Sequence, residues 1–128
     1  MAVFRPQQNN VCKLNFDDKF FYTLEIHENT LNEIAEIAQK QVKFLEGLKE
    51  FNGDSLDKAY NSSLDAIDKI LGEGAGADIM SLYEKPSIFN VVSIINFIVE
   101  EYKAAYSAIF DKHKASGTVP PTVQRGRR

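Results

Sequence analysis

One segment of the chain, residues 88–109, constrains the fold more than any other. Its apolar residues recur at steps of three and four along the sequence: Ile88, Val91, Val92, Ile95, Ile98, Val99, Tyr102, Ala105, Tyr106 and Ile109. Ile94 and Phe97 widen this stripe. A helix that is apolar around so much of its circumference must be covered by other elements. We therefore predict a buried helix that begins within a residue or two of Pro86 and Ser87, around which the rest of the chain packs.

This helix is not expected to cross a membrane. Ser93 and Asn96 interrupt its most apolar part and Glu100 closes it, whereas a bilayer span takes about 20 apolar residues. The single cysteine, Cys12, cannot form an internal disulfide, and the N-terminal residues lack the basic and apolar regions of a signal peptide. We expect a protein of a reducing cytoplasm.

The N-terminal part has the alternation of a β-hairpin. Residues 1–10 have no apolar period and are predicted to be a flexible N-terminus. Two alternating series follow, on either side of the acidic turn 17–19: Cys12, Leu14 and Phe16, then Phe20, Tyr22, Leu24 and Ile26. Because a lone two-stranded ribbon is marginal in water, its apolar face must lie on the helices or join strands of another copy. This requirement favours a homo-oligomer.

Two amphipathic helices are expected next. Thr30 and Glu33 have the spacing of a capping box for a helix over residues 30–51. Its predicted apolar stripe consists of Leu31, Ile34, Ala35, Ala38, Val42, Leu45 and Leu48. Asp54 is a suitable N-cap for a second helix, which should end at Gly72 in a left-handed conformation. The apolar face of this helix consists of Leu56, Tyr60, Leu64, Ile67 and Leu71.

The remaining segments complete the predicted architecture. Residues 71–76 are too rich in glycine for regular structure, and residues 77–83 can form only a short helix. With 128 residues, the chain has the size of one domain. We predict a mainly α, single compact domain over residues 11–114, with an N-terminal β-hairpin followed by three main helices and one short helix. Residues 115–128 should be a disordered basic tail.

The charge distribution argues against a nucleic-acid partner. The net charge is −3, and residues 111–128 carry five basic residues against Asp111, so that this end is +4 and the remainder −7. An acidic body repels phosphate backbones, and three tail arginines are fewer than the basic face expected of a nucleic-acid binder.

No residue pattern predicts catalysis, a cofactor or a metal. Gly72, Gly74 and Gly76 follow a helix, whereas a phosphate-binding loop follows a strand and opens a helix. His27 and His113 lack further ligands at metal-site spacing and are expected at the surface. Cys12 is expected to be a small buried residue. The acidic residues of the second helix, Asp54, Asp57, Asp65 and Asp68, alternate with lysines and are interpreted as a solvated face.

From Leu64 the chain contains the run Leu-Asp-Ala-Ile-Asp-Lys-Ile-Leu-Gly-Glu-Gly-Ala-Gly-Ala-Asp-Ile-Met, then Lys-Pro-Ser-Ile-Phe-Asn-Val-Val and Phe-Ile-Val-Glu-Glu-Tyr. This segment, residues 64–99, resembles the tail assembly chaperones of long-tailed (siphovirus-type) bacteriophages of Gram-positive bacteria, and the resemblance as a whole covers roughly residues 11–128. The stretch 65–79 is the most characteristic part. Members of this family resemble the chain in being short, acidic and helical, with a strand-forming start and a basic tail.

The resemblance implies partners rather than a reaction. Such a protein would bind the tape-measure protein in the host (bacterial) cytoplasm, keep it soluble and help to recruit tail-tube subunits. It would be absent from the mature virion. The family also implies a longer form made by ribosomal frameshifting, with the fusion falling in residues 115–128.

Six residues are candidates for partner binding. Amphipathic helices line the apolar grooves that hold helical segments, so the candidates are exposed aromatic and tail residues: Phe21, Phe44, Phe51, Arg125, Arg127 and Arg128. Phe44 and Phe51 fall beside the main stripe and fit the core equally well. Two other functions stay open: a structural head-tail connector or tail-completion subunit, and a small regulator that binds a host protein.

Overall fold

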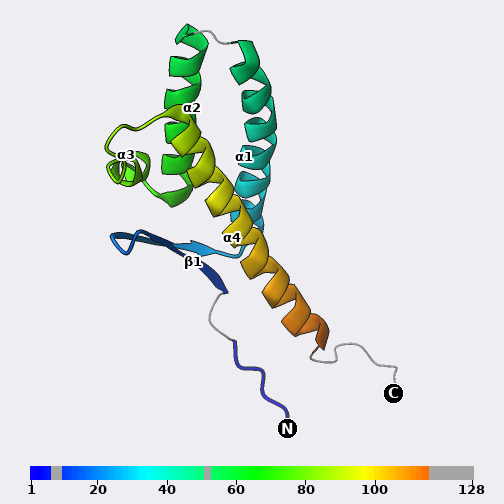
Figure 1. Ribbon diagram of the computed structural model, residues 1–128. Helices are drawn as coiled ribbons and strands as arrows, with labels where there is room; N and C mark the ends of the chain where they lie inside the picture. The colour runs from blue at the N-terminus through cyan, green and yellow to red at the C-terminus, as the bar shows by residue number, and fades with distance from the viewer. Residues whose placement is uncertain (7–9, 51–52, 116–128) are drawn as a thin grey trace.

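A computed structural model describes residues 1–6, 10–50 and 53–115. Its elements are β1 (Val11–Phe16), β2 (Phe20–Glu25), α1 (Glu28–Gly47), the 3-10 turn η1 (Leu48–Glu50), α2 (Gly53–Leu71), α3 (Ala75–Met80) and α4 (Ile88–Ala115). α1 and α2 lie side by side, α4 packs across both, and α3 and the hairpin cover the remaining sides of the core (Figure 1). The predicted mainly α domain with an N-terminal hairpin and one short helix is confirmed.

The hairpin is antiparallel and follows the predicted alternation. Leu14 pairs with Tyr22 and Phe16 with Phe20, and the inward side chains of β1 are all buried. Asp17 and Asp18 both have φ 56°, the left-handed conformation that a tight hairpin turn needs and that Asp tolerates better than most residues. β1 packs against α4 and β2 against α2, so the helices of the same chain cover the apolar face.

α1 differs from its prediction at its start. The helix begins at Glu28, and its N-cap is His27, whose Nδ1 accepts a hydrogen bond from the Asn29 N–H at 3.2 Å. The capping box at Thr30 is therefore wrong, because Thr30 already lies within the first turn. The chain leaves the hairpin at Ile26, whose N–H donates to Asn10, so the helix starts directly after the last strand pairing.

The buried face of α1 is also rotated from the predicted stripe. Ile37 and Gln41 are buried with Ile34, whereas Val42 is 63% and Leu45 is 42% exposed. Gln41 satisfies its amide inside the core by donating to the Val92 carbonyl at 3.3 Å. Because Gln41 is polar, the apolar pattern of the sequence does not mark the face that is buried. The pattern therefore predicts a stripe on the neighbouring face of α1.

The other helix boundaries agree more closely. α2 begins at Gly53, so Asp54 lies in its first turn rather than at the N-cap. α2 ends at Leu71, and Gly72 follows with a positive φ of 123°, as predicted. α4 begins at Ile88, where Asn90 Oδ1 accepts from the N–H of Ser87 at 2.9 Å.

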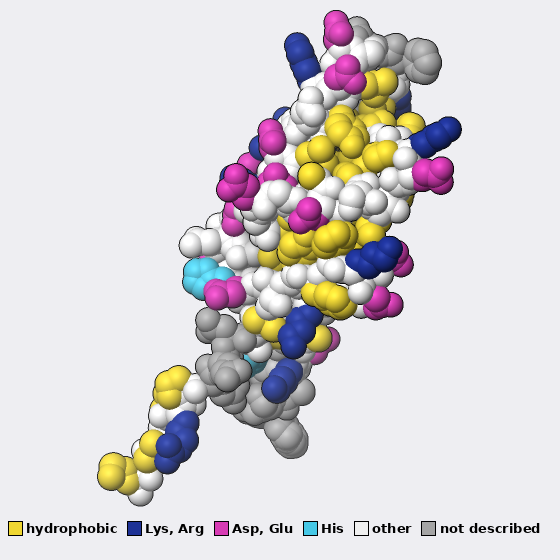
Figure 2. Space-filling model, turned by 90° about the vertical axis from the view of Figure 1, so that its left-hand side faces the viewer, with side chains coloured by type: hydrophobic (Ala, Val, Ile, Leu, Met, Phe, Trp, Pro, Cys, Tyr) yellow, Lys and Arg dark blue, Asp and Glu magenta, His cyan; other side chains and the backbone are white. Residues whose placement is uncertain are grey.

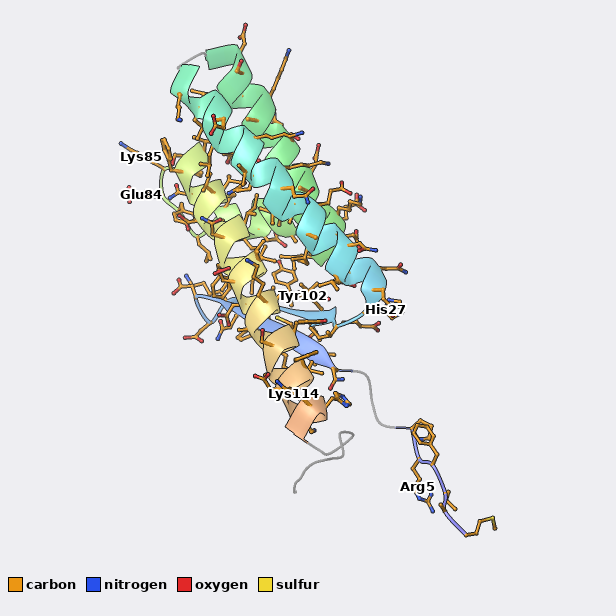
Figure 3. The ribbon with its side chains drawn as sticks, turned by 90° about the vertical axis from the view of Figure 1, so that its right-hand side faces the viewer. Arg5, His27, Glu84, Lys85, Tyr102 and Lys114 are labelled. Carbon is orange, nitrogen blue, oxygen red and sulfur yellow. The ribbon has the colours of Figure 1, made fainter. Side chains whose placement is uncertain are left out.

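α4 is the centre of the core. The buried cluster joins both strands and all four α-helices, and α4 contributes more of its members than any other element: Val91, Ile94, Ile95, Ile98, Val99 and Tyr102. Tyr102 is fully buried, and its hydroxyl donates to the Glu25 carbonyl at 3.1 Å. Figure 3 shows Tyr102 beside the start of α1, where His27 lies. This hydrogen bond fixes the end of the hairpin on the central helix.

Candidate partner-binding groove

α3 is held in place by one side chain of α2 and two glycines. Gly72 and Gly74 have φ values of 123° and 84°, which let the chain reverse between α2 and α3. Asp68 Oδ1 accepts a hydrogen bond from the Gly76 N–H at 2.7 Å, at the start of α3. Asp68 is half-buried, so the prediction that it belongs to a solvated face is wrong. Its carboxylate instead satisfies a backbone donor of the first helical turn.

The short helix begins earlier than expected, because glycine is needed for packing. α3 includes Ala75 and Gly76, which were predicted to lie in an irregular stretch. A Cβ atom at Gly76 would lie 3.1 Å from Asp68 Oδ1 and 3.1 Å from the Leu64 carbonyl oxygen. α3 can therefore approach α2 this closely only with glycine at this position.

An apolar groove lies between the turn end of the hairpin, α3 with the residues after it, and the first half of α4. We call it the α3 groove. Its volume is about 350 Å³, and its lining is mostly apolar: Phe16, Ile79, Leu82, Tyr83, Ile94 and Phe97, with Asn15, Asp17 and Ser93 at its edge. Figure 2 shows hydrophobic side chains gathered in bands across the side of the molecule that carries α3.

Aromatic contacts give one wall of the groove a fixed shape. The ring centroids of Phe16 and Phe97 are 5.2 Å apart, and those of Phe16 and Tyr22 are 5.8 Å apart, both edge to face. Phe16 is buried, whereas Phe97 is 38% exposed. Part of the Phe97 ring is thus exposed on the groove wall, while the other part packs against Phe16.

The polar edge of the groove is preorganised. The Asn15 amide donates to Asp18 Oδ1 at 2.8 Å, and Asn15 Oδ1 accepts from the Asp18 N–H, also at 2.8 Å. Burial, with smaller contributions from Asp78 and Asp68, raises the pKa of Tyr22, whose ring packs against Phe16 of the groove wall. An apolar floor with a fixed polar and acidic edge suits an apolar helix with an uncharged or basic side.

Burial raises the pKa of two titratable groups of the core. Burial, and then Glu101, raises the pKa of the Cys12 thiol. Burial likewise raises the pKa of Tyr102, against a smaller lowering by the backbone of His27. A raised thiol pKa is the opposite of what a nucleophilic cysteine needs, in agreement with the predicted packing role of Cys12.

The structure places Phe21 near the groove and Phe44 elsewhere. Phe21 is 65% exposed and pairs across the hairpin with Asn15, which lines the groove. Phe44 is half-buried in a separate hollow of about 340 Å³ between α1 and α2, edged by Lys40 and Lys43. Phe51 and the tail residues Arg125, Arg127 and Arg128 lie outside the described residues.

The sequence prediction missed three residues of the groove. Phe97 was assigned to the core stripe of α4, although it lies opposite Ile95 and Val99 on the helix. Leu82 and Tyr83 were assigned to the short helix, but they follow its end and are half-buried against the core. The available signal for Phe97 was its position between Ser93 and Glu101, at the polar edge of the apolar stripe of α4.

The remaining motifs are accounted for structurally. Gly74 is the left-handed N-cap of a helix of only six residues, His27 caps α1, and His113 is exposed. Among residues 1–6, 10–50 and 53–115, no three His, Cys, Asp or Glu side chains are grouped as a metal site would need. In the same part of the chain, no helix combines the length and hydrophobicity required to span a bilayer.

Comparison of the chain with protein-family models, with curated proteins and with solved structures found no match.

Proposed function

We propose that the protein is a tail assembly chaperone of a long-tailed bacteriophage. It holds apolar helical segments of the tape-measure protein, keeps that protein soluble in the host cytoplasm and helps to recruit tail-tube subunits. The observation that carries the proposal is the α3 groove, an open apolar surface with an exposed aromatic ring. The resemblance to this family in residues 64–99 supports it from the sequence.

The α3 groove and the family resemblance involve the same part of the molecule. Residues 64–99 comprise the end of α2, the whole of α3 and the first half of α4. These elements supply most of the groove lining, including Ile79, Ile94 and Phe97. The groove volume of about 350 Å³ is enough for a few apolar side chains of a helix that presents residues at steps of three and four.

Co-expression with candidate tape-measure and tail-tube proteins, followed by affinity pull-down, tests the proposal. The unmodified chain should retain the tape-measure protein, and Phe97→Ser should reduce the retained amount because it removes an exposed ring of the groove. Phe89→Ser is the matched control, since Phe89 is 66% exposed on the same helix but does not line the groove. Failure of the unmodified chain to retain either protein would contradict the proposal.

A structural subunit would bind similar partners but would stay in the particle. Mass spectrometry of purified virions separates the two functions. We expect peptides of this chain to be absent from the mature virion, whereas a connector or tail-completion subunit would be present in stoichiometric amounts.

A further inference from the structure

The C-terminal half of α4 extends beyond the hairpin and the other helices. Figure 1 shows this part of the helix continuing past the hairpin and the start of α1, toward the C-terminus. Burial decreases along the helix: Tyr102 is fully buried, whereas Tyr106 is 42% and Phe110 is 56% exposed. The hydrophobic side chains of this segment are therefore available to another chain.

The exposed charges of this segment have a symmetrical arrangement. Glu100, Lys103, Ser107, Asp111 and Lys114 are all exposed, and their spacing of three or four residues places them along one side of the helix. Lys103 and Asp111 are each four residues from Ser107 and have opposite charges. Glu100 and Lys114 are each seven residues from Ser107 and also have opposite charges. When two copies of this side are placed antiparallel with Ser107 opposite Ser107, each charge therefore faces an opposite charge.

We propose that two copies of the chain associate through this side of α4, with the helices antiparallel and Ser107 at the two-fold axis. Glu100 of each copy then lies near Lys114 of the other, and Lys103 near Asp111. The intrahelical pair of Lys103 and Glu100, at 3.5 Å, becomes part of a four-charge cluster at each end of the contact. In a two-fold symmetric contact of this kind, every favourable pair occurs twice.

The apolar side chains fit the same register. Phe110 and Ala104 are each three residues from Ser107, so the ring of one copy covers the small Ala104 of the other. Ala104 and Ser107 are both exposed and small, which allows the two helices to approach closely. A parallel arrangement in register would instead place Glu100 against Glu100 and Lys103 against Lys103. The charges therefore select both the partner, a second copy, and its orientation.

This surface is separate from the α3 groove, whose α4 residues are Ser93, Ile94 and Phe97. Self-association can accordingly fail while tape-measure binding persists, and tape-measure binding can fail while self-association persists.

Charge reversal provides the test, because Glu100→Lys and Lys114→Glu each replace two attractive pairs by two repulsive ones. Sedimentation velocity over tens to hundreds of micromolar should show a dimer for the unmodified chain and about ten-fold weaker association for either variant.

Mixing the two variants gives the decisive measurement. A Glu100→Lys chain carries two lysines at these positions and a Lys114→Glu chain two glutamates, so the mixed dimer regains both attractive pairs. We expect the equimolar mixture to associate more strongly than either variant alone. Circular dichroism of each variant checks that α4 is still folded.

Phe110→Ser should also weaken the dimer, whereas Phe89→Ser, at the opposite end of α4, should leave it unchanged. A monomeric unmodified chain over the whole concentration range would overturn the proposal. So would variants that associate as strongly as the unmodified chain, or a mixture that associates no better than its components.

Discussion

Gly76 lies where α3 packs closely against α2. Gly76→Ala adds a Cβ atom 3.1 Å from both Asp68 Oδ1 and the Leu64 carbonyl oxygen, so α3 must move away from α2. We expect a loss of about 1–3 kcal/mol in the free energy of unfolding, measured by urea denaturation. Gly47→Ala is the control, because nothing lies within 4 Å of its added Cβ in α1. That variant should be unchanged or up to about 1 kcal/mol more stable.

Tyr102 links the stability of the protein to alkaline pH. Its pKa is raised from the ordinary value of 10.0, chiefly by burial, so the folded state favours the neutral phenol. The resulting contribution to the free energy of unfolding is fully present below the Tyr102 pKa of the unfolded chain. It is lost as pH rises through the Tyr102 pKa of the folded state. Tyr102→Phe removes the titration together with the hydrogen bond to Glu25.

Urea denaturation of the Tyr102→Phe variant at two pH values separates these effects. At about pH 7 the variant should be less stable by about 1 kcal/mol, because the Glu25 carbonyl loses its donor. Between about pH 7 and pH 10.5 the variant should lose less stability than the unmodified chain. Equal losses in both proteins would show that Tyr102 does not titrate in this range. Tyr22, whose pKa is also raised, is common to both proteins and cancels in the comparison, whereas Cys12 contributes to the raised pKa of Tyr102 itself.

At the scale of elements, α1 is the helix whose predicted apolar stripe differs from its observed buried face. Ile37 is buried and Val42 is 63% exposed, although only Val42 belonged to the predicted stripe. Ile37→Ala should cost about 2–5 kcal/mol, the usual range for emptying a buried isoleucine site. Val42→Ala should change stability by less than about 0.5 kcal/mol. Thermal or urea unfolding of both variants checks the assignment, and the reverse order of costs would contradict it.

α3 depends on a single side chain from the preceding helix. Asp68→Ala removes the acceptor of the Gly76 N–H and should destabilise the protein by about 1 kcal/mol, a typical cost of losing a helix cap. The loss should be local, so hydrogen exchange of the α3 amides should accelerate more than that of α4. Asp65→Ala removes an exposed carboxylate of the same helix and should leave α3 protection unchanged.

The elements that the sequence predicted well are those with local causes. The hairpin alternation, the glycine end of α2 and the Ser87 start of α4 depend on neighbouring residues, and each is found near its predicted position. The errors have causes distant in the sequence. Gln41 is buried because the Val92 carbonyl accepts its amide, and Gly76 is helical because Asp68 reaches it. The α3 groove was missed for the same reason, since its walls come from three separate segments.

At the scale of the whole molecule, the long central helix gives the chain two distinct surfaces. The first half of α4 contributes to the core and to the α3 groove, and the second half extends away and carries the complementary charges. α4 contacts α1, α2 and β1, so it joins the hairpin to the two other long helices. Because both proposed surfaces depend on one helix packed against the whole body, the core around α4 should unfold as one cooperative unit.

Ile95→Asp tests this dependence directly. Ile95 is 2% exposed near the middle of the buried part of α4, so the variant places an unpaired carboxylate in an apolar environment. The cost should be several kcal/mol, comparable with the whole stability of about 5–15 kcal/mol expected of a domain. We expect far-ultraviolet circular dichroism and tyrosine fluorescence both to show that the variant is unfolded.

The neighbouring Asn96→Asp variant is the control, since it adds the same charge at an exposed position and should stay folded. A native-like Ile95→Asp spectrum, or loss of structure in the hairpin alone, would show that the elements around α4 fold independently of it.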